Sequence, residues 1–272
     1  MNVIELRDIH RTYRRGGFFG KAEWLHVLRG IDLDLRQGES LGLVGRSGSG
    51  KSTLGRIMLG LESPDSGTVR IMGRETTGMR TLPPDVRRAV QVVFQDAIGS
   101  CNPRLTAGEI IAEPLRNFDR LSGTALRQRV AELLEQVGLS PDDAGKLPGR
   151  FSGGQLQRVC IARALAPRPR VIVLDEAVSS LDMLVQARIL DLLEDLRREH
   201  DTAYLFVTHD LRLVRRFCDR AFIMADGVLE SFAPSNIHTE FAPAALSELS
   251  GALLPPLPPS LSPEKLQRPA GA

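Results

Sequence analysis

Polar and apolar positions near the N-terminus are interspersed in short runs that are typical of β-strands. The segments NVIELRDI (2–9) and LHVLRGIDLDL (25–35) alternate between the two kinds of side chain, and TVRIMG (68–73) has the same character. Between the first two segments lies a glycine-rich stretch, RRGGFFGKAEW, which predicts a loop or a hairpin tip. We therefore expect a β-rich region in the first part of the chain.

Further along, compact apolar runs alternate with helical patterns. SLGLVG (40–45) predicts a buried strand and is followed by the helical pattern KSTLGRIMLGL, and QVVFQ (91–95) predicts another buried strand. Helical periodicity dominates from about residue 106 to 166. VIVLD (171–175) and AYLFVTH (203–209) are apolar runs that precede the helical patterns LVQARILDLLEDLRREH and DLRLVRRFC. Strands that alternate with helices predict a parallel sheet with crossover helices.

The pattern ends beyond about residue 233. The stretch LLPPLPPSLSP is too rich in proline to continue a helix or a sheet, so we expect residues 253–272 to form a largely disordered tail. The remaining length of this 272-residue chain is enough for one substantial α/β domain with a large core.

Charge and cysteine content narrow the function classes. A formal charge of +2, with both signs interspersed, gives no argument for binding nucleic acid. Cys101, Cys160 and Cys218 are far apart and odd in number, which predicts neither a disulfide framework nor a metal site and favours a reducing cytoplasm. No run approaches 18 apolar residues, so we expect any membrane role to be peripheral and to run through a partner.

The stretch GRSGSGKS (45–52) fits the phosphate-binding pattern G-x-x-x-x-G-K-[ST], and it stands between a predicted strand and a predicted helix. Glycines allow backbone N–H groups to surround phosphate oxygens at the positive end of the helix. Lys51 is expected to reach the β- and γ-phosphates of a nucleotide, and Ser52 to ligate Mg²⁺. The alternative is an ordinary glycine turn before a helix. The expected nucleotide-binding residues of this loop are Gly45, Arg46, Ser47, Gly48, Ser49, Gly50, Lys51, Ser52 and Thr53.

Two adjacent carboxylates, Asp175 and Glu176, follow the apolar run VIVLD. Two negative charges at the end of a buried strand are costly unless something positive or reactive lies beside them. Ligands of parallel α/β sheets bind beyond the carboxyl ends of the strands, where the phosphate loop is also expected. We therefore expect Asp175 to hold hydrated Mg²⁺ and Glu176 to orient and polarise a water molecule against the γ-phosphate. The alternative is that the pair only caps the next helix.

A second anion site is predicted at FSGGQLQR (151–158). Ser152, Gly153, Gly154 and Gln155 expose backbone N–H groups at the start of a helical pattern. Two such sites in one chain predict that each half of a dimer completes the nucleotide site of the other. The segment resembles the LSGGQ signature of ATP-binding-cassette (ABC) ATPases, with Phe151 in place of the usual leucine. The alternative is a serine-capped helix without a ligand.

This resemblance covers nearly all of residues 1–232. It implies an α/β fold, the nucleotide-binding domain of ABC proteins: a RecA-like P-loop NTPase core, an antiparallel β subdomain near the N-terminus and an inserted α-helical subdomain at about residues 96–165. Residues 233–272 are then a C-terminal tail.

Other residue roles also follow from the resemblance alone. Tyr13 matches the aromatic residue that stacks on adenine, and Gln95 matches the glutamine that contacts Mg²⁺ and senses the membrane partner. Asp182 closes the loop Ser180-Leu181-Asp182 that communicates across the dimer, and His209 matches the histidine that contacts the γ-phosphate. A strand-end tyrosine and a structural histidine are the alternatives. The implied catalytic set is Glu176, His209, Gln95 and Lys51, and the implied Mg²⁺ ligands are Ser52, Gln95 and Asp175.

Three stretches point to the transported substrate. NPRLTAGEIIAEPL (102–115) resembles a segment of the ATP-binding subunits of peptide and nickel importers. YRRGGFFGKAEWLHVL, and LDEAVSSLD with Ala177 in place of the usual proline, resemble the E-type subunits of nickel importers. Cys218 is the last cysteine, so the cysteine-rich C-terminal motif of peptide importers is missing. The resemblance implies an ATPase that powers nickel uptake at the cytoplasmic face of a bacterial membrane. A dipeptide, oligopeptide or metal–metallophore importer is the alternative.

The implied cofactors are ATP and Mg²⁺. The implied partners are a sister ATPase subunit (or a second copy in isolation), two transmembrane permease subunits and an extracytoplasmic substrate-binding protein. The five histidines form no clustered ligand set, so nickel rests on the resemblance alone. A DNA-repair cassette ATPase would need a long coiled coil between the two anion sites, a P-loop kinase has no use for FSGGQ, and a translation-factor cassette protein would need two cassettes.

Overall fold

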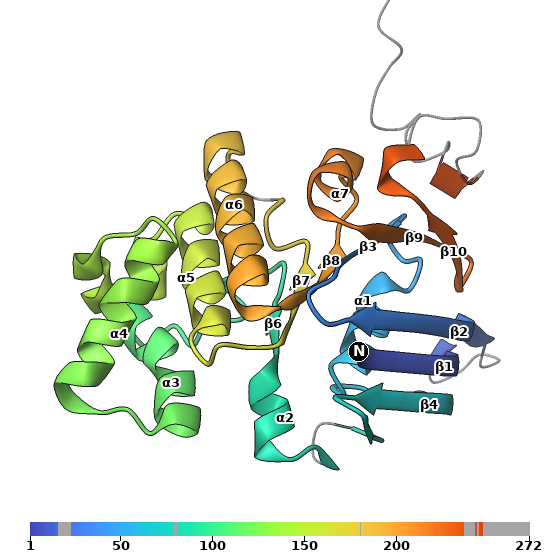
Figure 1. Ribbon diagram of the computed structural model, residues 1–272, viewed down its shortest axis with the longest axis horizontal. Coiled ribbons are helices and arrows are strands. Elements are labelled where there is room, and N and C mark those ends of the chain that lie inside the picture. Colours follow the sequence, from blue (N-terminus) through green and yellow to red (C-terminus); the bar gives the residue numbers. More distant parts are fainter. Residues whose placement is uncertain (16–22, 79–80, 180, 237–242, 244, 247–272) are drawn as a thin grey trace, which may run out of the picture.

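The computed structural model describes residues 1–15, 23–78, 81–179, 181–236, 243 and 245–246. The tip of the predicted N-terminal insert (16–22) and the predicted proline-rich tail (253–272) lie outside these residues. Figure 1 shows an antiparallel sheet on one side of the molecule, a second sheet beside it and a group of helices on the other side.

The antiparallel sheet confirms the β-rich N-terminal region. Its strand order is β2-β1-β4-β5. The strands are β1 (Asn2–Arg15), β2 (Glu23–Arg36), β4 (Ser66–Ile71) and β5 (Arg74–Glu75). At the start of β4, Gly67 has φ +99°, and a Cβ there would lie 2.4 Å from the carbonyl oxygen of Asp8. Only glycine therefore allows β4 to approach β1 this closely.

The second sheet confirms the predicted parallel architecture and forms the centre of the molecule. Its order is β10-β9-β3-β8-β7-β6, with all pairs parallel except β9 with β10. The strands are β3 (Ser40–Gly45), β6 (Val90–Val93), β7 (Val171–Asp175), β8 (Ala203–Val207), β9 (Arg220–Ala225) and β10 (Val228–Phe232). β3 and β8 are buried throughout, as expected for strands that are covered on both faces.

Helices cover the parallel sheet and form a separate group beside it. Among the described residues they are α1 (Lys51–Met58), α2 (Pro84–Ala89), α3 (Ala107–Asp119), α4 (Gly123–Gln136), α5 (Gly153–Leu165), α6 (Met183–His200) and α7 (Leu211–Phe217), with short 3₁₀ turns η2 (Pro141–Gly145), η3 (Pro148–Arg150) and η4 (Pro234–Asn236). In Figure 1, α3, α4 and α5 lie together at the end opposite the antiparallel sheet. None of the described helices is both long and apolar enough to cross a membrane.

The parallel sheet separates two apolar clusters. Leu41 and Leu43 of β3 pack with the antiparallel sheet and α1, whereas Val44 packs with the cluster that contains the helical group. Successive side chains of a strand point to opposite faces, so β3 contributes to both clusters. This double burial fixes the position of the loop that follows β3.

We predict that Tyr204→Phe stabilises the protein. Tyr204 on β8 is fully buried, and its phenolic oxygen has no hydrogen-bond partner among the described residues. A buried, unpartnered hydroxyl costs about 1–3 kcal/mol. Urea denaturation should therefore show a free energy of unfolding that is about 1 kcal/mol higher in the variant.

The matched control is Phe206→Tyr on the same face of β8. Both Tyr204 and Phe206 have ring centroids 5.4 Å from that of Phe217. Adding a hydroxyl at Phe206 should lower the free energy of unfolding by a similar amount. Equal or lower stability of Tyr204→Phe would contradict the prediction.

Candidate active site

The loop between β3 and α1 is shaped to surround an anion. Gly48 and Gly50 have φ +80° and +109°, in the left-handed region that favours glycine. A Cβ on Gly50 would lie 3.0 Å from the carbonyl oxygen of Val27 on β2. α1 begins immediately after Gly50, so the N–H groups of its first turn, at the positive end of the helix, are available to phosphate oxygens.

Lys51 holds this loop from within. Its side chain is largely buried, and Nζ donates hydrogen bonds to the carbonyl oxygens of Gly45 and Arg46, both at 2.8 Å. Burial lowers the pKa of Lys51, whereas the negative charges of Glu176 and Asp175 raise it. The ammonium is thus placed in the loop in advance and can exchange a carbonyl partner for a phosphate oxygen.

Asp175, the last residue of β7, lies beside the loop. Burial raises the pKa of its carboxyl group, and the charge of Glu176 raises it further, while a hydrogen bond from the Ser52 hydroxyl and the charge of Lys51 lower it. A divalent cation prefers oxygen ligands, and it would stabilise the ionised form of a carboxylate that lies next to another negative charge. The oxygens of Ser52 and Asp175 therefore fit Mg²⁺, with phosphate and water to complete its coordination.

Glu176 is held by a strained backbone. Its φ is +50°, and its N–H donates a 2.9 Å hydrogen bond to the carbonyl oxygen of Val207 at the end of β8. The side chain is mostly buried, with Oε2 3.4 Å from Nδ1 of the half-exposed His209. Positive φ in a non-glycine residue is uncommon and often marks a functional site. The structure thus brings both predicted residues, the acid and the histidine, to one place.

The alternative of a helix cap does not hold for these carboxylates. α6 begins at Met183, seven residues beyond Glu176, and its N-cap is Asp182, whose Oδ1 accepts a 3.0 Å hydrogen bond from the N–H of Val185. Asp182 is exposed on the surface. Ser180, in the same predicted loop, lies outside the described residues.

Gln95 lies at the same edge of the sheet, two residues beyond the end of β6. Val93 pairs with Leu174, so the chain that leaves β6 runs beside the one that leads to Asp175. Gln95 is exposed. Gln95 thus lies at the sheet edge that bears Asp175, and its role as a Mg²⁺ ligand stays a prediction.

The SGGQ turn is on the surface and away from the phosphate loop. Ser152 is the N-cap of α5: its Oγ accepts a hydrogen bond from the N–H of Gln155 (3.3 Å), whose Oε1 accepts one from the N–H of Ser152 (2.9 Å). Ser152 and Gly153 are exposed, and a Cβ on Gly153 would contact nothing within 4 Å. Figure 1 shows α6 and the strands of the parallel sheet between α5 and α1. The turn is therefore open to a ligand from outside α5.

α5 also holds the segment from Phe94 to Cys101, which contains Gln95. Gln157 Nε2 donates to the carbonyl oxygen of Phe94 (3.0 Å), and Arg163 Nη1 donates to that of Ser100 (2.7 Å). Between them the Sγ atoms of Cys160 and Cys101 are 3.4 Å apart. These contacts fix the segment along the helix, so the two are expected to move together.

Tyr13 on β1 is held by a carboxylate other than the Asp175–Glu176 pair. Its hydroxyl donates a 2.5 Å hydrogen bond to Oε1 of Glu62 and lies 3.4 Å from Oγ1 of Thr53 on α1. The guanidinium of Arg11 lies 5.0 Å from the ring centroid. Glu62 and Arg11 were not predicted from the sequence, because neither belongs to a motif and Glu62 lies 49 residues from Tyr13.

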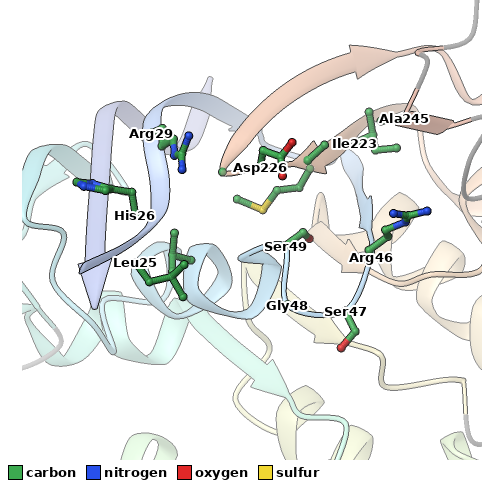
Figure 2. A pocket seen from close by; sticks show the side chains of 14 residues that line it. Leu25, His26, Arg29, Arg46, Ser47, Gly48, Ser49, Ile223, Asp226 and Ala245 are labelled. Carbon is green, nitrogen blue, oxygen red and sulfur yellow. The ribbon is translucent and has the colours of Figure 1, made fainter. Parts of the chain in front are cut away.

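A cavity of about 350 Å³ flanks the phosphate loop. Figure 2 shows residues of β2, including Leu25 and His26, on one side of it, and Ile223 and Asp226 of the β9–β10 hairpin above the loop. Ser47, Gly48 and Ser49 of the loop contribute to its lining. Lys51, Asp175 and Glu176 do not. The cavity thus lies on the β2 side of the loop, and Ser52 and Asp175 do not line it.

Sequence comparisons agree with this geometry. Residues 28–179 match the family model described as ABC transporter. The chain is 49% identical to the nickel import ATP-binding protein NikE of Rhodospirillum rubrum, over 96% of this chain and 94% of that protein. It is 44% identical to the protein of the same name from Pseudomonas putida, over 95% of each chain, and 42% identical to that of Escherichia coli O157:H7, over 95% of this chain and 97% of the other.

Solved structures extend the comparison to the fold. The dimeric post-hydrolysis state of the ATP-binding cassette MJ0796, bound to ADP and Pi, matches with a TM-score of 0.77 and 33% identity, over 85% of this chain and 98% of that one. The cbiO1 protein of Clostridium perfringens, part of an ABC transporter complex, matches with a TM-score of 0.72 and 25% identity, over 88% and 91%. The chain belongs to the ABC transporter family, and its fold is that of the ATP-binding cassette.

Proposed function

We propose that this chain is the ATP-hydrolysing subunit of an ABC importer that powers nickel uptake at the cytoplasmic face of a bacterial membrane. The observation that carries the ATPase is the placement of Lys51, Asp175 and Glu176 at one edge of the parallel sheet. Nickel as the substrate is supported by the names of relatives that are 42–49% identical over almost the whole chain. We assign residues 1–232 to the ATPase domain, with a helical subdomain at about 96–165, and residues 233–272 to a tail.

ATP would lie along the phosphate loop. The amides of the loop and of the first turn of α1, with the ammonium of Lys51, would hold the phosphates, and Tyr13 would stack on the adenine. Ser52, Gln95 and Asp175 would hold Mg²⁺. Bound there, Mg²⁺ supplies neutralisation of the charge that develops on the phosphate oxygens.

Glu176 would act as the general base. Its carboxylate would accept a proton from the attacking water as the oxygen approaches the γ-phosphorus, and the products are ADP and phosphate. The hydrogen bond from the N–H of Glu176 to Val207 fixes the backbone from which the side chain extends. His209, 3.4 Å from the carboxylate, limits the rotamers that the side chain can adopt. His209 is half exposed, and from its place beside Glu176 it would contact the same phosphate.

The second half of each site would come from a partner. Because the SGGQ turn is exposed and far from the loop of its own chain, we infer that Ser152, Gly153, Gly154 and Gln155 close over the nucleotide of a sister ATPase subunit, or of a second copy in isolation. Asp182, exposed at the start of α6, would lie at the same joint. Two nucleotides are then enclosed between two cassettes.

Closure would reach the membrane subunits through α5. The hydrogen bonds from Gln157 to Phe94 and from Arg163 to Ser100 join the helix that bears the SGGQ turn to the segment on both sides of Gln95. When the turn moves onto a partner's nucleotide, the segment moves with it. We propose that two permease subunits receive this motion at residues 95–115.

Nickel itself would be selected elsewhere in the transporter. Within the part of the chain that the structure describes, no group of three or more histidine, cysteine or carboxylate side chains could hold a metal ion. Selection would rest with an extracytoplasmic substrate-binding protein and the permease subunits. Because the ATPase chemistry is independent of the cargo, a dipeptide, oligopeptide or metal–metallophore importer is the second candidate.

We predict that Glu176→Gln lowers ATP turnover in the assembled transporter by about 10²–10⁴-fold, the usual worth of a positioned base. The amide cannot accept the proton, yet it has the same size, so ATP binding should change by less than about 2-fold. Phosphate release and nucleotide titration measure the two quantities. Glu199→Gln, at an exposed site on α6, is the control and should behave as wild type. Turnover at the wild-type rate in Glu176→Gln would refute the assigned role.

We predict that Gly153→Asp abolishes ATP-dependent dimerisation. In purified Glu176→Gln protein, ATP and Mg²⁺ should double the mass measured by light scattering, and adding Gly153→Asp should prevent this because the carboxylate repels a partner's phosphates. The fold should tolerate the change, since a Cβ at Gly153 contacts nothing within 4 Å. Asn117→Asp, exposed on α3, adds the same charge as a control. A dimer that persists in Gly153→Asp would contradict the shared site.

We predict that a strain lacking this gene accumulates less radioactive nickel, and that the wild-type gene restores uptake whereas Glu176→Gln does not. Uptake of a labelled dipeptide, measured in parallel, should be the same in all strains. Restoration of dipeptide uptake in place of nickel uptake would favour the second candidate.

A further inference from the structure

Tyr13 is fixed by a carboxylate that no motif identifies. Glu62 follows α1, and its Oε1 accepts hydrogen bonds from the hydroxyl of Tyr13 (2.5 Å) and from Nε of Arg11 (2.8 Å). The side chains of Glu62 and Arg11 are 16% and 25% exposed, so water competes weakly for these bonds. A short hydrogen bond to a charged acceptor is among the stronger kinds.

The second partner of the ring is itself held in place. Nη1 of Arg11 lies 2.6 Å from Oδ1 of Asp65, whose Oδ2 accepts a hydrogen bond from the N–H of Thr12 (2.6 Å). The guanidinium is therefore restrained by two carboxylates while it lies 5.0 Å from the centroid of the Tyr13 ring. Such an arrangement is an attractive cation–π contact. Because Arg11 covers one face of the ring, a planar ligand can stack only on the other.

The same network reaches the phosphate loop. Oγ1 of Thr53, two residues after Lys51, lies 3.4 Å from the hydroxyl of Tyr13. The position of the ring is thus set relative to α1, whose first turn would hold the phosphates. The base and the triphosphate of a nucleotide are covalently linked. The Tyr13 ring therefore helps binding only when its distance from the phosphate loop and its tilt match the bound base.

We propose that Glu62 is a positioning residue for nucleobase recognition: it sets the orientation of the Tyr13 ring through the phenolic hydroxyl, with Arg11 held against the ring. The inference rests on the proposed stacking of adenine on Tyr13. Glu62 does not touch the phosphates, so its contribution is confined to the base. A structural brace for β1 would instead affect stability and leave nucleotide affinity unchanged.

The test compares the affinities of two ligands by titration calorimetry on the full chain in the presence of Mg²⁺. ATP carries the base, whereas inorganic tripolyphosphate lacks it. Removal of a whole stacking ring costs about 5- to 160-fold in affinity, so a misoriented ring should cost less. We expect Glu62→Ala to raise the Kd for ATP by about 3- to 10-fold and to leave the Kd for tripolyphosphate within about 2-fold.

Further variants test whether Glu62 affects ATP binding through the hydroxyl of Tyr13. Glu62→Gln keeps an oxygen that accepts from the Tyr13 hydroxyl and should restore ATP affinity to within about 2-fold of wild type. Tyr13→Phe removes the hydroxyl and should raise the Kd for ATP alone, and in this background Glu62→Ala should add less than about 2-fold. Glu75→Ala, an exposed carboxylate paired with Arg70 in the same sheet, is the control and should match wild type.

An unchanged Kd for ATP in Glu62→Ala, an equal loss for tripolyphosphate, or a full effect of Glu62→Ala in the Tyr13→Phe background would overturn the inference. Should Glu62→Ala not fold, an unchanged Kd for ATP in Tyr13→Phe overturns it equally. A further variant, Lys51→Ala, tests the proposed function separately. If the phosphate loop does not bind nucleotide, this variant leaves the Kd for ATP and the Kd for tripolyphosphate unchanged.

Discussion

The parallel pairing of β3, β8 and β7 is the constraint from which the active site follows. Val207 of β8 lies opposite Asp175 on one side, and its neighbour on the other side is Leu43 of β3. Two strand spacings therefore separate the strand that delivers the phosphate loop from the strand that delivers the carboxylates, about 10 Å in all. Hydrogen bonds from Glu176 N–H to Val207 and from Thr208 N–H to Leu43 continue the pairing past the strand ends. Main-chain hydrogen bonds therefore set the position of the phosphate loop relative to Asp175 and Glu176, independently of side-chain contacts.

The same edge carries an unfavourable balance of charge. One buried ammonium, Lys51, faces two adjacent carboxylates, and the pKa of Asp175 is raised in the folded protein. Ionisation of Asp175 therefore costs folding stability, and this cost grows as the pH rises through the pKa of the folded state. Binding of a divalent cation would remove the cost and add its own binding free energy to the stability of the fold. The folded protein is thus less stable at the position where a divalent cation would bind.

Local patterns in the sequence were enough to predict the central strands and to identify the motifs. The bounds of β3 agree with its prediction because a buried apolar run meets a glycine turn there. α1 was predicted to reach residue 61 but ends at Met58, since Gly60 adopts φ +68° and closes the helix. β9 and β10 were missed, although the pair Asp226-Gly227 between them is a hairpin signal. Contacts such as the hydrogen bond between Tyr13 and Glu62 join segments that are far apart in the sequence, and no local pattern predicts them.

The left-handed backbone of Glu176 determines how this ATPase can be altered. At φ +50° the chain turns sharply away from β7, and the direction of the Cα–Cβ bond is set by that turn together with the bond to Val207. Any replacement would project from the same point, so shortening to aspartate would withdraw the carboxylate by one methylene without re-aiming it. Aspartate also tolerates positive φ better than glutamate. Substitution at this position would therefore relieve backbone strain and at the same time shorten the reach of the carboxylate proposed to be catalytic.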